Sequence, residues 1–99
     1  MAQERHKVVY TNIAHQQIFA AMLYIARQGF PETALRFADS LYDFGQSLSI
    51  FPEKYSICKR KPLSSKELRC ASFEHYLFVY KVEQHEIIIH AVIHSSRIK

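Results

Sequence analysis

The chain has 99 residues, of which 48% are hydrophobic and 22% are charged, so it has room for one domain with a single hydrophobic core. These proportions are those of ordinary globular proteins and exclude an intrinsically disordered chain. No apolar run approaches the ~18–20 residues that a membrane-spanning helix needs, and the charged N-terminus lacks the apolar stretch of a secretory signal. We therefore expect a single cytoplasmic domain over residues 1–99, with no membrane partner.

The net charge of +4 is concentrated in one short stretch of the chain. Between positions 54 and 69 there are six basic residues and one acid, so this stretch carries +5 and the rest of the chain −1. The basic residues are Lys54, Lys59, Arg60, Lys61, Lys66 and Arg69, and the acid is Glu67. Such a run is either a solvated surface loop or a patch that binds an anionic partner, and its charge alone does not choose between them.

Two cysteines, Cys58 and Cys70, are too few for a disulfide framework, and their spacing matches no Cys-x-x-Cys motif. Cys70 lies inside a predicted strand, which favours a small buried core residue. We therefore expect two reduced thiols. Gly29 and Gly45 are the only glycines, so the chain has no Gly-rich phosphate loop, and we expect no small-molecule cofactor.

The first predicted elements are a short strand and an amphipathic helix. Residues 6–10 are mostly apolar and β-branched, as in a strand, and either Thr11 or Asn12 can cap the helix that follows. Apolar residues then recur every three or four positions over residues 14–25, which predicts one buried face. Gly29 suits the left-handed position that closes a helix.

A second amphipathic helix is predicted over residues 31–51. Its apolar stripe consists of Ala34, Phe37, Ala38, Leu41, Phe44 and Leu48. Pro31 suits the first helical position and Pro52 ends the helix. Because the connection to the first helix is so short, the two helices must form an antiparallel hairpin.

In the last third of the chain the apolar residues recur at every second position, which predicts three strands over residues 67–72, 75–83 and 86–94. The last two form a hairpin around the polar residues 83–86, and residues 56–59 are a candidate for one more short strand. The order β-α-α-β-β-β predicts an α+β fold. In it, an N-terminal strand and a helical hairpin pack on a small, twisted, mainly antiparallel sheet.

The histidines do not predict a metal site. His90 and His94 are four residues apart and would share one face of a regular strand, but no third ligand is placed by spacing. His94 closes the final strand, so we expect it at the rim of the sheet beside Arg97.

One enzymatic chemistry is compatible with the residues. Cleavage of RNA through the ribose 2′-hydroxyl needs a proton acceptor, a proton donor, and cations that stabilise the charge on the phosphate. The candidate cations are Lys59, Lys61, Arg69 and Arg97, and the candidate proton carriers are His94 and Glu67.

The ordered set of motifs resembles the RelE/ParE toxin superfamily over nearly the whole chain. The resemblance lies in Arg69-Cys70-Ala71-Ser72, the run HYLFVYKV over residues 75–82, Ile87-Ile88-Ile89 and the ending Val92-Ile93-His94. In the first half, it lies in Tyr24-Ile25, Pro31, Ala34, Phe37, Leu41 and Pro52. The resemblance implies the toxin of a type II toxin–antitoxin, or plasmid stabilisation, system.

The superfamily has two branches with different targets. RelE-like members cut mRNA in the ribosomal A site, whereas ParE-like members poison DNA gyrase and have no known catalytic residues. RelE-like toxins carry an arginine where Leu77 follows Tyr76, and a tail tyrosine that is lacking after Arg97. The Arg69-Cys70-Ala71-Ser72 run and the Val-Ile-His ending look more ParE-like.

The resemblance therefore implies a gyrase-directed inhibitor, with a ribosome-dependent mRNA endonuclease as the alternative. In the endonuclease, Arg69 and Arg97 would stabilise the phosphate while His94 or Glu67 transfers protons. The expected target-binding surface consists of Lys59, Arg60, Lys61, Lys66, Arg69, His94 and Arg97. A cognate antitoxin should cover an apolar groove along the helices or a free sheet edge, and we expect a homodimer or a toxin–antitoxin hetero-oligomer.

Overall fold

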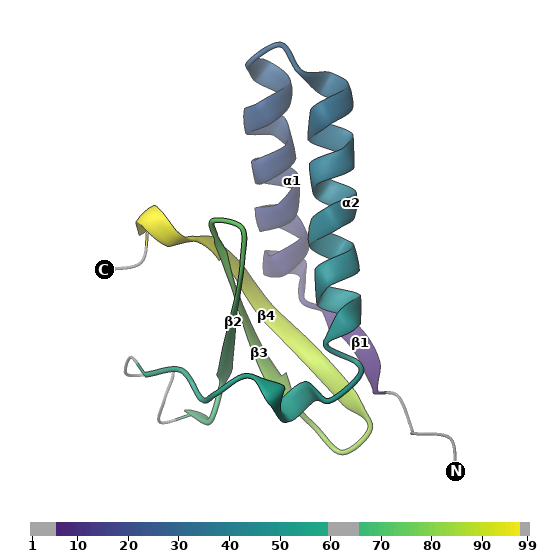
Figure 1. The fold of residues 1–99 in the computed structure, drawn as a ribbon, viewed down its shortest axis with the longest axis vertical. Helices are drawn as coiled ribbons and strands as arrows, with labels where there is room; N and C mark the ends of the chain where they lie inside the picture. The colour runs from purple at the N-terminus through teal and green to yellow at the C-terminus, as the bar shows by residue number, and fades with distance from the viewer. Residues whose placement is uncertain (1–5, 60–65, 98–99) are drawn as a thin grey trace.

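A short strand, a helical hairpin and three further strands follow one another in the computed structural model of this chain, which describes residues 6–59 and 66–97 (Figure 1). The elements are β1 (Lys7–Tyr10), α1 (Asn12–Arg27), α2 (Pro31–Ser47), η1 (Pro52–Lys54), β2 (Arg69–Phe73), β3 (Tyr76–Val82), β4 (Glu86–His94) and η3 (Ser95–Arg97), where η marks a short 3₁₀ turn. This confirms the predicted β-α-α-β-β-β order and the α+β fold class. Among the described residues, no helix is long and apolar enough to span a membrane.

The four strands form one mixed sheet in the order β1-β4-β3-β2. β1 pairs in parallel with β4, with Val8 opposite Ile87 and Tyr10 opposite Ile89, and the other two pairs are antiparallel. The first strand thus lies beside the last, and β1 and β2 are the two edges.

The main core lies between the helical hairpin and one face of the sheet. Alternation along β3 directs Phe78 and Tyr80 towards the helices, where neither is exposed, while α2 contributes Leu41. The opposite face carries a smaller apolar cluster of Cys58, Leu68 and Val79, with Leu77 and Ile93 packed against it. The sheet therefore has a helix-covered face and a second face that buries fewer apolar side chains.

Two polar side chains fasten α1 to β4. The Thr11 hydroxyl accepts a hydrogen bond from the Ala14 N–H (3.1 Å), capping the helix, and donates one to the His90 carbonyl (3.0 Å). Six residues after Thr11, the Gln17 side-chain oxygen accepts a hydrogen bond from the Val92 N–H (2.6 Å). Of the two predicted caps, Thr11 is the one used.

Two predicted boundaries differ from the structure. α2 ends at Ser47 rather than at position 51 because the N–H groups of Leu48, Ser49 and Ile50 bond to carbonyls only three residues back, as in a 3₁₀ turn, and Phe51 then has a φ of 54° before Pro52. β2 begins at Arg69 rather than at 67 because Glu67 has a φ of 59°.

An irregularity in pairing interrupts the regular alternation of β4. Val79 pairs with Ala91 but Tyr80 pairs with Ile89, so His90 is an extra residue on its strand. As a result Ile89 and Val92, which differ in parity, both face the helical core. The regular alternation from which we expected His90 and His94 to share one face is therefore interrupted at His90.

Candidate target-binding surface

Arg69, the first residue of β2, binds the segment that follows α2. Its guanidinium donates a hydrogen bond to the Tyr55 carbonyl (2.6 Å) and a weaker one to the Glu53 carbonyl (3.5 Å). It also lies 3.7 Å from the Glu53 carboxylate. Only 21% of the Arg69 side chain is exposed, so most of this cation holds neighbouring chain rather than facing a partner.

Tyr80, which pairs with Arg69 across the sheet, holds the same segment three residues before Tyr55. Its hydroxyl donates to the Pro52 carbonyl over 2.7 Å. Burial raises the pKa of Tyr80 to about 12, while the positive charge of Arg69 acts in the opposite direction. The phenol therefore remains a hydrogen-bond donor at neutral pH.

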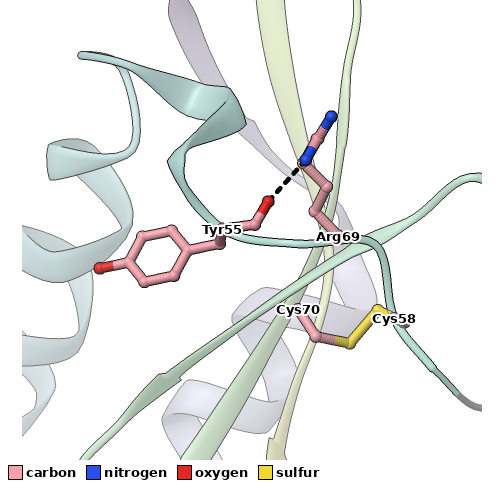
Figure 2. The surroundings of a disulfide bond; sticks show 4 residues. All are labelled: Tyr55, Cys58, Arg69 and Cys70. Carbon is pink, nitrogen blue, oxygen red and sulfur yellow. Dashed lines mark hydrogen bonds between the residues drawn. A yellow bond between two sulfur atoms is a disulfide. The ribbon is translucent and has the colours of Figure 1, made fainter.

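Cys58 and Cys70 form a disulfide, with 5.0 Å between their Cα atoms (Figure 2). The expectation of two reduced thiols is therefore wrong. It rested on the number of cysteines, whereas the bond depends on their position: residues 56–58 run antiparallel to the start of β2 and bring the two side chains together. The one feature of the sequence that pointed to this pairing was the candidate strand over residues 56–59. In the structure it is present as the single Ile57–Arg69 bridge.

The exposed cations at this end of the sheet include Lys59, directly after Cys58, and Lys66. Arg60 and Lys61 lie outside the described residues. Glu67 is also exposed, two residues before Arg69. We call the described cations on either side of the disulfide the basic edge: Lys59, Lys66 and Arg69.

His94 lies at the opposite end of the sheet, in a pocket of about 340 Å³ between α1 and the end of β4. The pocket is lined by Gln17, Ala20, Ala21, Tyr24, Tyr76, Val92, Ile93, His94 and Ser96. His94 Nδ1 accepts the Ser96 backbone N–H (3.1 Å) and lies 2.7 Å from the Ser96 hydroxyl, and the ring packs edge-on against Tyr76. Because a backbone N–H can only donate, the neutral imidazole carries its proton on Nε2. Arg97 ends η3, and its side chain lies outside the description.

The structure does not bring Arg69 and His94 together. Arg69 is aligned with Tyr80 and Ile89, whereas His94 is aligned with Tyr76 and Phe73. Four residues along the strands and two strand spacings separate them, roughly 16 Å. The predicted surface is thus divided into the basic edge and the His94 pocket, and one small substrate cannot contact both Arg69 and His94. No group of three metal-ligating side chains occurs among the described residues either.

Comparison with known proteins places this geometry in a family. Residues 8–99 match the family described as ParE toxin of type II toxin-antitoxin system, parDE. Among curated proteins, none gives a significant match. A solved structure described as the chromosomal ParDE TA system from P. aeruginosa superposes with a TM-score of 0.77 over 93% of this chain and 98% of that chain, at 16% identity, which shows a shared fold. With the family match spanning nearly its whole length, this chain belongs to the ParE toxin family of type II toxin–antitoxin systems, on the ParE branch of the RelE/ParE superfamily.

Proposed function

We propose that this chain is a cytoplasmic, plasmid-stabilising toxin that arrests growth by binding DNA gyrase, and that a cognate antitoxin neutralises it. The observation that carries the proposal is the basic edge on a ParE-family sheet. A stretch with a charge of +5 includes the exposed Lys59 and Lys66 in a chain whose remainder carries −1. Such a local positive field favours contact with an acidic protein surface or with the DNA that gyrase holds.

The separation of the candidate catalytic residues supports inhibition by contact rather than RNA cleavage. A phosphate-cleaving site needs its cation and its proton carrier within reach of the same atoms. Arg69 already uses its guanidinium on Tyr55, and His94 lies at the other end of the sheet. We therefore place the exposed Lys59 and Lys66 in the gyrase contact, give Arg69 the role of holding the segment that leads to Lys59, and assign no catalytic role to His94.

The helical hairpin supports an antitoxin as partner. Its exposed large apolar side chains are Ile13, Phe19, Tyr24, Phe30 and Leu35, each more than half exposed. The end of the hairpin that carries the α1–α2 connection stands clear of the sheet (Figure 1). Apolar surface of this extent favours a protein partner, either the antitoxin or a second copy of the chain.

The test is a supercoiling and cleavage assay with purified gyrase, plasmid and increasing amounts of the folded protein. We expect supercoiling to be lost and double-strand breaks to accumulate. The variant K59E/K66E should need at least tenfold more protein for the same inhibition because it reverses two charges of the basic edge.

The matched control is R27E/R36E, which changes the net charge by the same amount on exposed helix positions away from the sheet edge. It should inhibit like the wild type. Equal loss of inhibition in both variants would assign the effect to net charge. If gyrase still supercoils the plasmid at full rate in the presence of wild-type protein with a native circular dichroism spectrum, the gyrase proposal is overturned.

A further inference from the structure

The disulfide lies where a short segment covers half of an otherwise open sheet edge. β2 is an edge strand, and residues 56–58 pair with its first residues. The Cys58 N–H donates to the Leu68 carbonyl (2.7 Å), and the Cys70 N–H donates to the Ser56 carbonyl (3.2 Å). We call residues 55–59 the edge segment. It ends in Lys59, one of the three residues of the basic edge.

The edge segment is attached from both faces of β2. Arg69 shares the helix-covered face with Ala71 and grips the Tyr55 carbonyl, whereas Cys70 belongs to the opposite face and holds Cys58 (Figure 2). Apart from the disulfide, the attachments of the segment are hydrogen bonds, the buried Cys58 side chain and the half-buried Tyr55 ring, which packs edge-on against Phe44 in the main core. Ser56 and Ile57 are exposed. The covalent bond is therefore the strongest constraint on residues 56–59, of which only Cys58 is buried.

We propose that Cys58 and Cys70 form a reversible redox site, which fastens the edge segment to β2 when oxidised and releases it when reduced. The reductant is a dithiol. Its thiolate attacks the sulfur of Cys70, the more exposed of the two, the S–S bond breaks and Cys58 leaves as a thiolate that takes up a proton. The second thiol of the reductant then resolves the mixed disulfide. Two electrons and two protons pass to the protein, and the dithiol becomes a disulfide.

The consequence for inhibition rests on the proposed gyrase contact. In the oxidised protein the Cα atoms of Cys58 and Cys70 are held 5.0 Å apart, which keeps Lys59, the next residue, beside the start of β2. After reduction Lys59 must be ordered again each time the target binds, and that ordering opposes binding. The oxidised form is therefore the stronger inhibitor, and a reducing environment weakens the toxin.

The release of the edge segment is measured without gyrase, by amide hydrogen exchange of the full chain before and after reduction. A mass increase of 2 Da verifies that two thiols have formed. We expect the amides of Cys58 and Cys70 to exchange roughly tenfold to a hundredfold faster in the reduced protein, while those of β4 in the middle of the sheet are unchanged. The variant C58S/C70S should match the reduced rates and should not respond to the reductant.

Two exchange results would overturn the redox site. One is unchanged protection of Cys58 and Cys70 after complete reduction. The other is a disulfide that the dithiol reduces only as fast as the amides of the whole sheet exchange. Such a bond would open only when the protein unfolds, and it would be a fixed part of the fold.

The regulatory step is tested by half-inhibition of gyrase with oxidised and reduced wild-type protein. We expect at least fivefold more protein to be needed after reduction, with C58S/C70S insensitive to the reductant. Equal inhibition by both forms would overturn redox control and leave the gyrase proposal standing. No inhibition by either form would overturn the gyrase proposal, while the exchange rates still decide whether the segment is released.

Discussion

Gly45 marks the closest approach of α2 to the sheet, and replacing it with alanine should destabilise the protein. The residue is buried in the last turns of α2. A Cβ atom at this position would overlap the Tyr10 hydroxyl and would lie only 3.0 Å from both the Tyr10 ring and the Ile89 Cδ1 atom. Tyr10 has little freedom to retreat because its hydroxyl donates to the Tyr42 carbonyl (3.1 Å) and its ring packs against Tyr42.

The size of the effect follows from three opposing contributions. Alanine stabilises a helix interior by about 1 kcal/mol relative to glycine. Overpacking costs about 1–3 kcal/mol, and loss of the Tyr10 hydrogen bond costs about 0.5–1.5 kcal/mol. The free energy of unfolding of G45A should therefore fall by about 2 kcal/mol, and its Tm by about 8–16 °C for a domain of this size.

Thermal and urea unfolding followed by circular dichroism measure this change in G45A, Y10F and the double variant Y10F/G45A. Phenylalanine at position 10 removes the hydroxyl that the new methyl group overlaps. The double variant should therefore be more stable than the sum of the single effects by about 1 kcal/mol. A G45A protein as stable as the wild type, or strict additivity in this cycle, would refute the steric explanation.

Three further predictions concern side chains that hold the elements together. T11A should lose about 1–2 kcal/mol in urea unfolding because the cap and the bond to β4 both disappear, whereas T11S should stay close to wild type. Y80F should lose about 1–2 kcal/mol because the Pro52 carbonyl is left buried without its donor, and an unchanged midpoint would contradict that bond. Burial raises the pKa values of Tyr10 and Tyr80 in the folded protein to about 12, above their usual 10.0, so at alkaline pH the folded chain keeps protons that the unfolded chain releases. Their contribution to stability is complete below pH 10 and is lost as the pH rises through about 12, and urea midpoints between pH 9 and 12 should fall less steeply in Y80F than in the wild type.

The elements themselves were predictable because short-range patterns define them. The alternation of Phe78 and Tyr80 placed both side chains in the core, and the range 86–94 of the last strand is that of β4. Thr11 could be recognised as a cap from its position before an apolar stripe. Each of these inferences uses residues within one or two turns, or a few strand positions, of one another.

The candidate surface was predictable in composition but not in arrangement. The sequence alone identifies Lys59, Lys66 and Arg69 as members of one basic stretch. It does not reveal that Arg69 is occupied by a backbone carbonyl, or that His94 lies at the other end of the sheet. Which residues of different strands lie side by side depends on the order and pairing of the strands, and contacts between distant parts of the chain determine that order.

What the sequence determines by itself is therefore the local content of this protein: its helices, its strands, its caps and the net charge of each stretch. Only the tertiary structure decides that β1 joins β4, that an extra residue at His90 reverses the alternation of the last strand, and that Cys58 meets Cys70. The physical reason is the distance along the chain over which each choice is made. Periodicity and capping depend on neighbouring residues, whereas β1 and β4 are partners about 79 residues apart whose pairing depends on how the helical hairpin and the whole sheet pack together.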